Sequence, residues 1–112
     1  MVLYAMTGSI KEADWRVFKQ IKEMAIERYC ERVLAEYREV IDDTDTHPHN
    51  RFLLMNRLTE NRDKQMALIF DGHARSKMTR QLYGMRLEGL VDDDQLAQLS
   101  EELRANTDPD RV

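Results

Sequence analysis

Residues 10–41 read IKEADWRVFKQIKEMAIERYCERVLAEYREVI, and this stretch decides the fold. It contains no Gly or Pro, and its apolar side chains recur every three or four residues, which is the period of an amphipathic helix. The first apolar set is Trp15, Phe18, Ile21, Ala25, Tyr29, Val33, Tyr37 and Val40. A second set lies beside it, at Val17, Met24, Cys30, Leu34 and Ile41. Ser9 and Glu12 match a capping box, so we expect one long helix over about 10–42.

The length of this helix predicts a partner chain. At 1.5 Å per residue it spans about 48 Å, whereas a compact domain of this size has a diameter of about 35 Å. The apolar stripe continues into the overhang, so we expect a second copy of the chain to cover it. The sequence therefore predicts an elongated helical homodimer. The expected dimer-interface residues are Trp15, Phe18, Tyr29, Val33 and Tyr37.

The rest of the chain also reads as helix. We expect three shorter helices, over about 51–70, 74–88 and 93–104, with Asn50 as the N-cap of the first and Gly72 and Gly89 as stops. One of Asp92–Asp94 is expected to cap the last helix, and residues 105–112 are expected to fray. With only 4 Gly and 2 Pro in 112 residues, a β-sandwich or barrel is excluded. The prediction is a single all-α domain over 1–112 with flexible tails.

Composition indicates a soluble cytoplasmic protein. No apolar run approaches the roughly 18 residues of a membrane span, and residues 1–6 lack the basic start of a signal peptide. The single cysteine, Cys30, cannot form an internal disulfide, which fits a reducing compartment. We expect Cys30 to be a small core or interface residue.

Charge is divided unevenly along the chain. Residues 51–86 carry 8 basic and 3 acidic side chains, whereas residues 1–50 and 87–112 are both net acidic. A basic middle can attract an acidic partner, either nucleic acid or an acidic protein face. It can equally offset the acidic ends within the fold or across a dimer. A small DNA-associated regulator is therefore one alternative. Because the overall pI is about 5.4, nucleic acid is not the favoured partner.

Motifs for catalysis and metal binding are absent from the sequence. There is no phosphate loop, nucleophile motif or cysteine pair. His47 and His49 are two residues apart in a connector, and His73 lies elsewhere, which is a weak pattern for zinc. A metal-dependent helical enzyme using these histidines is a second alternative. We expect no enzyme activity, no cofactor and no metal.

A resemblance to a known family appears in the second helix. Phe52, Leu54, Leu58 and Arg62 resemble a motif of the fluorescence recovery protein family, in which Phe52 stands where the family usually has Trp. Asn56 stands where the family has Asp. An acidic group there could pair with Arg62, whereas an amide can only hydrogen-bond.

The resemblance extends toward the end of the chain. Ser76 and the turn at Glu88-Gly89, followed by Leu96 and Leu99, are similar to the family's last two helices, although its tyrosine-rich segment before Ser76 is missing. Family members are small helical dimers that bind the light-activated orange carotenoid protein and speed its return to the resting state in photoprotection. The resemblance implies a non-enzymatic regulator, or a distant homologue with another protein partner. The implied partner-binding residues are Phe52, Leu54, Asn56 and Arg62.

Overall fold

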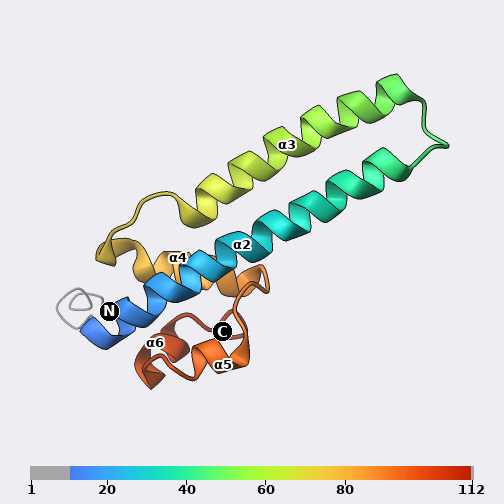
Figure 1. The fold of residues 1–112 in the computed structure, drawn as a ribbon. Helices are drawn as coiled ribbons and strands as arrows, with labels where there is room; N and C mark the ends of the chain where they lie inside the picture. The colour runs from blue at the N-terminus through green and yellow to red at the C-terminus, as the bar shows by residue number, and fades with distance from the viewer. Residues whose placement is uncertain (1–10, 112) are drawn as a thin grey trace.

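The computed structural model describes residues 11–111, which fold into helices joined by short connectors (Figure 1). The elements are α2 (Glu12–Asp42), α3 (Pro48–Phe70), the 3₁₀ turn η1 (Arg75–Lys77), α4 (Met78–Leu87), α5 (Asp93–Leu96) and α6 (Glu101–Asn106). No strand occurs between residues 11 and 111, so the predicted all-α class is confirmed. The expected capping residue Ser9 lies outside the described residues, and α2 follows Lys11 as its N-cap.

The long first helix is confirmed, and it forms one arm of a hairpin. α2 has 31 residues, which is about 46 Å of helix, and α3 runs back along it (Figure 1). The described chain measures 55 × 27 × 24 Å, with a radius of gyration of 17.3 Å, against about 13 Å for a compact domain of this length. The hairpin therefore projects beyond the core. However, α3 of the same chain covers part of the overhang that a second copy was expected to cover.

The core lies around the first half of α2, where α3, α4, α5 and α6 converge. Its side chains are Trp15, Phe18, Ile21, Ala25, Tyr29, Ile69, Phe70, Met78, Leu82, Met85, Leu90, Leu99 and Leu103. Trp15, Phe18 and Tyr29 were predicted to face a second copy, but they are buried inside their own chain. Their apolar area is already covered by the later helices, so they offer no surface to a dimer.

The turn of the hairpin begins α3 three residues earlier than predicted. His47, and not Asn50, is the N-cap, and its Nδ1 accepts a hydrogen bond from the backbone N–H of His49 at 3.2 Å. Pro48 then occupies the first position of the helix, where its missing N–H has no intrahelical role and its fixed φ suits helix entry. The Pro48 that was placed in the connector therefore starts the helix.

Arg51 stabilises this turn through hydrogen bonds from its guanidinium group. Its Nη1 donates to the carbonyl oxygen of Ile41 at 2.7 Å, and its Nε donates to that of Thr46 at 3.0 Å. Ile41 lies in the last turn of α2, where carbonyl groups have no intrahelical partner. The guanidinium thus ties the end of α2 to the start of α3.

The third helix is confirmed with a change at its start. A 3₁₀ turn precedes α4, which runs from Met78 to Leu87 in place of one helix over 74–88. Gly89 ends α4 with a φ of +68°. Its N–H donates to the carbonyl of Arg86 at 3.0 Å, and the N–H of Leu90 donates to that of Met85 at 2.9 Å. These two bonds define a Schellman motif, which favours glycine at this position.

The prediction of one continuous last helix over 93–104 is wrong. The structure has two short helices there, because Ser100 interrupts the run and caps α6 by accepting from the N–H of Leu103. Ser100 also donates from its backbone N–H and its hydroxyl to the buried Asp14 carboxylate, at 2.8 and 2.6 Å. The predicted fraying is also wrong at its start, since Thr107 is completely buried and its hydroxyl accepts from Arg86.

Candidate protein-binding site

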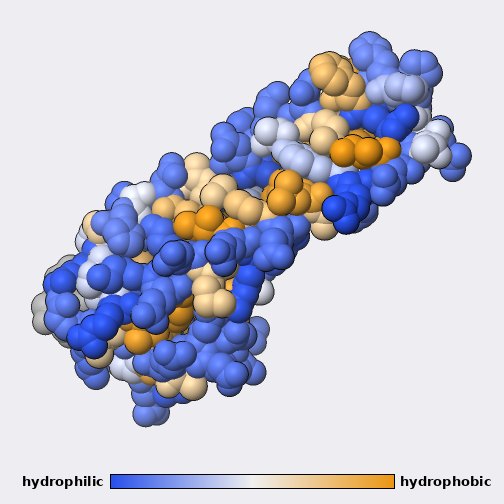
Figure 2. Space-filling model, viewed as in Figure 1, coloured by the Kyte–Doolittle hydropathy of each residue, from blue (hydrophilic) through white to orange (hydrophobic). Residues whose placement is uncertain are grey.

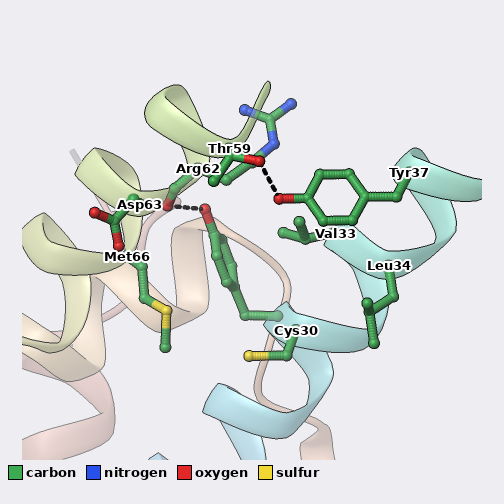
Figure 3. Close-up of a pocket in the computed structure, with 9 residues that line it drawn as sticks. Cys30, Val33, Leu34, Tyr37, Thr59, Arg62, Asp63 and Met66 are labelled. Carbon is green, nitrogen blue, oxygen red and sulfur yellow. Dashed lines mark hydrogen bonds between the residues drawn. The ribbon is translucent and has the colours of Figure 1, made fainter. Parts of the chain in front are cut away.

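A groove of about 250 Å³ runs between the middle of α2 and α3 (Figure 3). Apolar atoms dominate its surface, and no side chain of α4, α5 or α6 reaches it. We call it the hairpin groove. Its lining residues are Tyr29, Cys30, Val33, Leu34, Tyr37, Thr59, Arg62, Asp63 and Met66. Three predicted interface residues are among them: Tyr29, which is buried, and Val33 and Tyr37, which are half-buried.

Arg62 is held by an ion pair across the hairpin. Its Nε and Nη2 donate to the two carboxylate oxygens of Glu36 at 2.8 and 2.7 Å, a forked geometry that suits a guanidinium. The side chains are 34 % and 31 % exposed, so water screens the pair only partly. The hydrogen bonds from Arg62 lower the pKa of Glu36, and those same bonds raise the pKa of Arg62. Arg62 is therefore engaged within its own chain.

Two tyrosines complete the polar wall of the groove. Tyr29 donates its hydroxyl to the carbonyl oxygen of Arg62 at 2.9 Å, and burial raises the pKa of this phenol. The hydroxyl of Tyr37 pairs with that of Thr59 (Figure 3). Because the Thr59 hydroxyl donates to the carbonyl of Met55 at 2.9 Å, Tyr37 is the donor in that pair. Both tyrosines thus fasten α2 to α3 and fix the width of the groove.

Exposed apolar side chains extend the groove toward the tip of the hairpin. Leu34 is 62 % exposed, Ile41 55 % and Phe52 62 %, and hydrophobic surface follows the line between α2 and α3 (Figure 2). Cys30 is also exposed, so it is not a core residue. These α2 residues belong to the second apolar set of the sequence, and they were not assigned to a site. The sequence feature that could have identified them was the second apolar set itself, because no other residues of the helical stripe would cover it.

The four predicted partner-binding residues do not form one cluster. Phe52 and Asn56 are exposed and lie one helical turn apart on the same side of α3. Leu54 is exposed but lies about 200° away from Phe52 around the helix. Arg62 instead pairs with Glu36 on α2, so the partner of this arginine is not position 56. Glu36 was missed because nothing local in the sequence links two residues 26 positions apart.

Much of the basic central segment is used within the fold. Arg51 and Arg86 bond to backbone carbonyls, Arg62 pairs with Glu36, and Arg75 pairs with Glu12 at 2.5 Å. Two of these four arginines thus offset acidic residues inside the chain. Arg57, Lys64, Lys77 and Arg80 have no ion pair among the described residues.

The histidines have structural contacts. His47 caps α3, and the ring of His73 lies against that of Trp15, with centroids 5.2 Å apart. Within residues 11–111, no three His, Cys, Asp or Glu side chains are grouped so that they could hold a metal ion. None of the helices in that range is both long and apolar enough to cross a membrane.

Comparisons with protein-family models, with curated proteins and with solved structures found no match to this chain.

Proposed function

We propose that the chain is a non-enzymatic, cytoplasmic regulatory protein that binds other proteins through the α2–α3 hairpin and acts as a homodimer. The observation that carries this proposal is the row of apolar side chains left uncovered along the hairpin groove. Contiguous exposed apolar surface of this kind marks interaction sites in soluble proteins. The proposal also agrees with what the resemblance to the fluorescence recovery protein family implies.

The spacing of the α2 residues that line or extend the groove supports a second copy as one occupant. Cys30, Leu34, Tyr37 and Ile41 follow steps of four, three and four, which is a heptad spacing. In an antiparallel pair of α2 helices, Leu34 would pack against Tyr37 of the other copy. Glu31 and Arg38 flank this stripe seven residues apart, both exposed and without an ion pair in the described chain. The antiparallel arrangement brings each Glu31 near Arg38 of the other copy.

Oligomeric state under sedimentation equilibrium tests the dimer. Leu34→Glu places a charge in the proposed seam, so we expect it to shift the protein to monomer. Ala35→Glu adds the same charge one residue away, outside the stripe, and serves as the matched control. Reversing Glu31 and Arg38 singly should weaken the dimer, and combining both reversals should restore it. Equal behaviour of Leu34→Glu and Ala35→Glu would remove the groove from the interface.

The exposed tip residues form the proposed partner-docking surface. Phe52, Leu53 and Asn56 lie within about 100° of one another around the first turns of α3, and all three are exposed. An aromatic side chain on a rigid helix suits an interface anchor, because a few buried residues contribute most of the binding energy of a protein interface. A regulator speeds a partner's relaxation if it binds an intermediate better than either end state, and this requires no bond-making chemistry.

The family resemblance makes the partner testable. Light-activated orange carotenoid protein is mixed with the chain, the complex is sought by size-exclusion chromatography, and recovery is timed in the dark. We expect a complex and faster recovery, and we expect Phe52→Ala to reduce both. Lys11→Ala, at the start of α2 and away from the hairpin tip, is the control. Absence of a complex and of acceleration would refute this partner, and it would leave the dimer proposal to its own experiment.

A further inference from the structure

A second exposed apolar surface lies away from the hairpin groove. Leu68 of α3 is 76 % exposed, more than any other large apolar side chain of the described chain. On α4, Leu87 is 56 % exposed and Tyr83 41 %. None of the three lines the groove or belongs to the core. The proposed function therefore leaves them unexplained.

The helical spacing places these side chains on two stripes. Arg57, Asn61, Lys64 and Leu68 follow steps of four, three and four along α3, so they share one side of that helix. This side faces away from α2, because the α2-facing side carries Arg62, paired with Glu36.

α4 carries the second stripe, since Arg80, Tyr83 and Leu87 follow steps of three and four. The two helices meet where a Cβ at Gly84 would lie 3.8 Å from Ile69. Leu68 is the residue before Ile69 on α3, and Tyr83 is the residue before Gly84 on α4, so both stripes run past this contact.

The cations on these stripes are not neutralised by the fold. Arg57, Lys64 and Arg80 are exposed, and no carboxylate of the described residues lies within 4.0 Å of them. Glu60 precedes Lys64 by one turn, but these two form no ion pair by that criterion. By contrast, Arg51, Arg62, Arg75 and Arg86 have internal bonds, and Lys77 has no described ion pair. Three of the four cations of residues 51–86 that have no internal bond therefore lie on these two stripes.

We propose that the outer face formed by Arg57, Lys64 and Leu68 of α3 with Arg80, Tyr83 and Leu87 of α4 binds an acidic amphipathic helix of a partner protein. Such a helix would cover the leucines with its apolar stripe and pair its carboxylates with the flanking cations. Duplex DNA would satisfy the cations through its phosphates, but it would leave the leucines in water. The three apolar side chains thus favour a peptide occupant. This face is independent of the groove and of the dimer.

Fluorescence anisotropy with defined probes tests the outer face. The first probe is a fluorescein-labelled peptide of about 18 residues, about 27 Å as a helix, with leucine along one stripe and glutamate beside it. The second carries lysine in place of glutamate, and the third is a labelled duplex DNA of about 20 base pairs. We expect only the glutamate peptide to bind, and we expect its affinity to fall as KCl rises from about 50 to about 300 mM.

Two double variants separate this site from general electrostatics. Lys64→Glu with Arg80→Glu should weaken the glutamate peptide at least about tenfold and allow the lysine peptide to bind. Lys11→Glu with Arg16→Glu makes the same charge change at exposed positions around the start of α2, and it should leave both affinities unchanged. Circular dichroism checks that each variant keeps its helix content.

Three results would overturn the proposal. The first is no binding of the glutamate peptide to the unchanged protein. The second is equal weakening in both double variants, which would mean attraction by net charge alone. The third is DNA binding without peptide binding, which would make the face a nucleic-acid surface.

Discussion

Replacing Arg62 with methionine should weaken the hairpin, because Arg62 joins α3 to Glu36 of α2. The resemblance assigned this arginine to partner binding, whereas the structure has both of its described guanidinium bonds inside the chain. Methionine keeps much of the apolar stem and removes the charge and the donors. Glu36→Gln keeps the shape of the other partner and removes its charge. The double variant then closes a thermodynamic cycle.

The geometry sets the size of the coupling free energy between Arg62 and Glu36. Fully exposed ion pairs contribute about 0.2–1 kcal/mol, and hydrogen bonds to charged groups contribute about 1.5–3 kcal/mol. Side chains about one-third exposed, with forked contacts at 2.8 and 2.7 Å, lie between these cases. We therefore expect each single variant to lower the free energy of unfolding by about 1 kcal/mol, and the double variant to lower it by little more than one of them.

Urea unfolding followed by circular dichroism measures the cycle, because urea leaves ion pairs unscreened. With a slope of about 1.5 kcal/mol per molar, each single variant should shift the midpoint by roughly 0.7 M. The folded-state pKa of Glu36 is lowered, so its contribution is complete above the unfolded value of about 4.3. It is lost as the pH falls through the lowered folded pKa. A coupling of zero at pH 7 would refute the reasoning and leave Arg62 free to anchor a partner.

Three further substitutions test the fold by urea unfolding. Gly84→Ala should stabilise the protein by about 0.5–1 kcal/mol, since the added methyl meets Ile69 at ordinary contact distance, whereas Gly89→Ala should destabilise it by about 1 kcal/mol because its φ is +68°. Equal effects of the two would contradict the described backbone. Leu82→Ala should cost about 2–5 kcal/mol, because Leu82 is completely buried; a loss below about 1 kcal/mol would mean a looser core. Asp14→Ala should lower the free energy of unfolding by about 2–3 kcal/mol, because two hydrogen bonds to Ser100 are lost. An unchanged stability would mean that these bonds do not hold α6 against the start of α2.

Local patterns predicted the helices well. The apolar period over 10–41 gave α2 almost to the residue, and Gly89 ended α4 as expected, because its left-handed backbone depends on local geometry. Asp92 was within the predicted capping trio, and it caps α5 together with Gln95. These features arise within a few residues of chain, where sequence spacing and physical spacing agree.

Long-range contacts explain what the sequence did not predict. Ser100 reads as an ordinary helix residue until its bonds to Asp14 appear, 86 positions away. The wide apolar stripe of α2 could not show which part the chain's own later helices would bury, so Trp15 was assigned to an interface. The role of Arg62 likewise depended on Glu36. At each place, burial and pairing were decided by how separate helices pack.

Sedimentation equilibrium of the unchanged protein at about 50 μM tests the central claim most directly, since a dimer of micromolar affinity is largely assembled at that concentration. The uncovered hairpin groove predicts a mass of about 27 kDa, twice the 13.3 kDa of one chain, with Leu34→Glu returning it to one chain. A mass of one chain for the unchanged protein would contradict the claim that a second copy covers the groove.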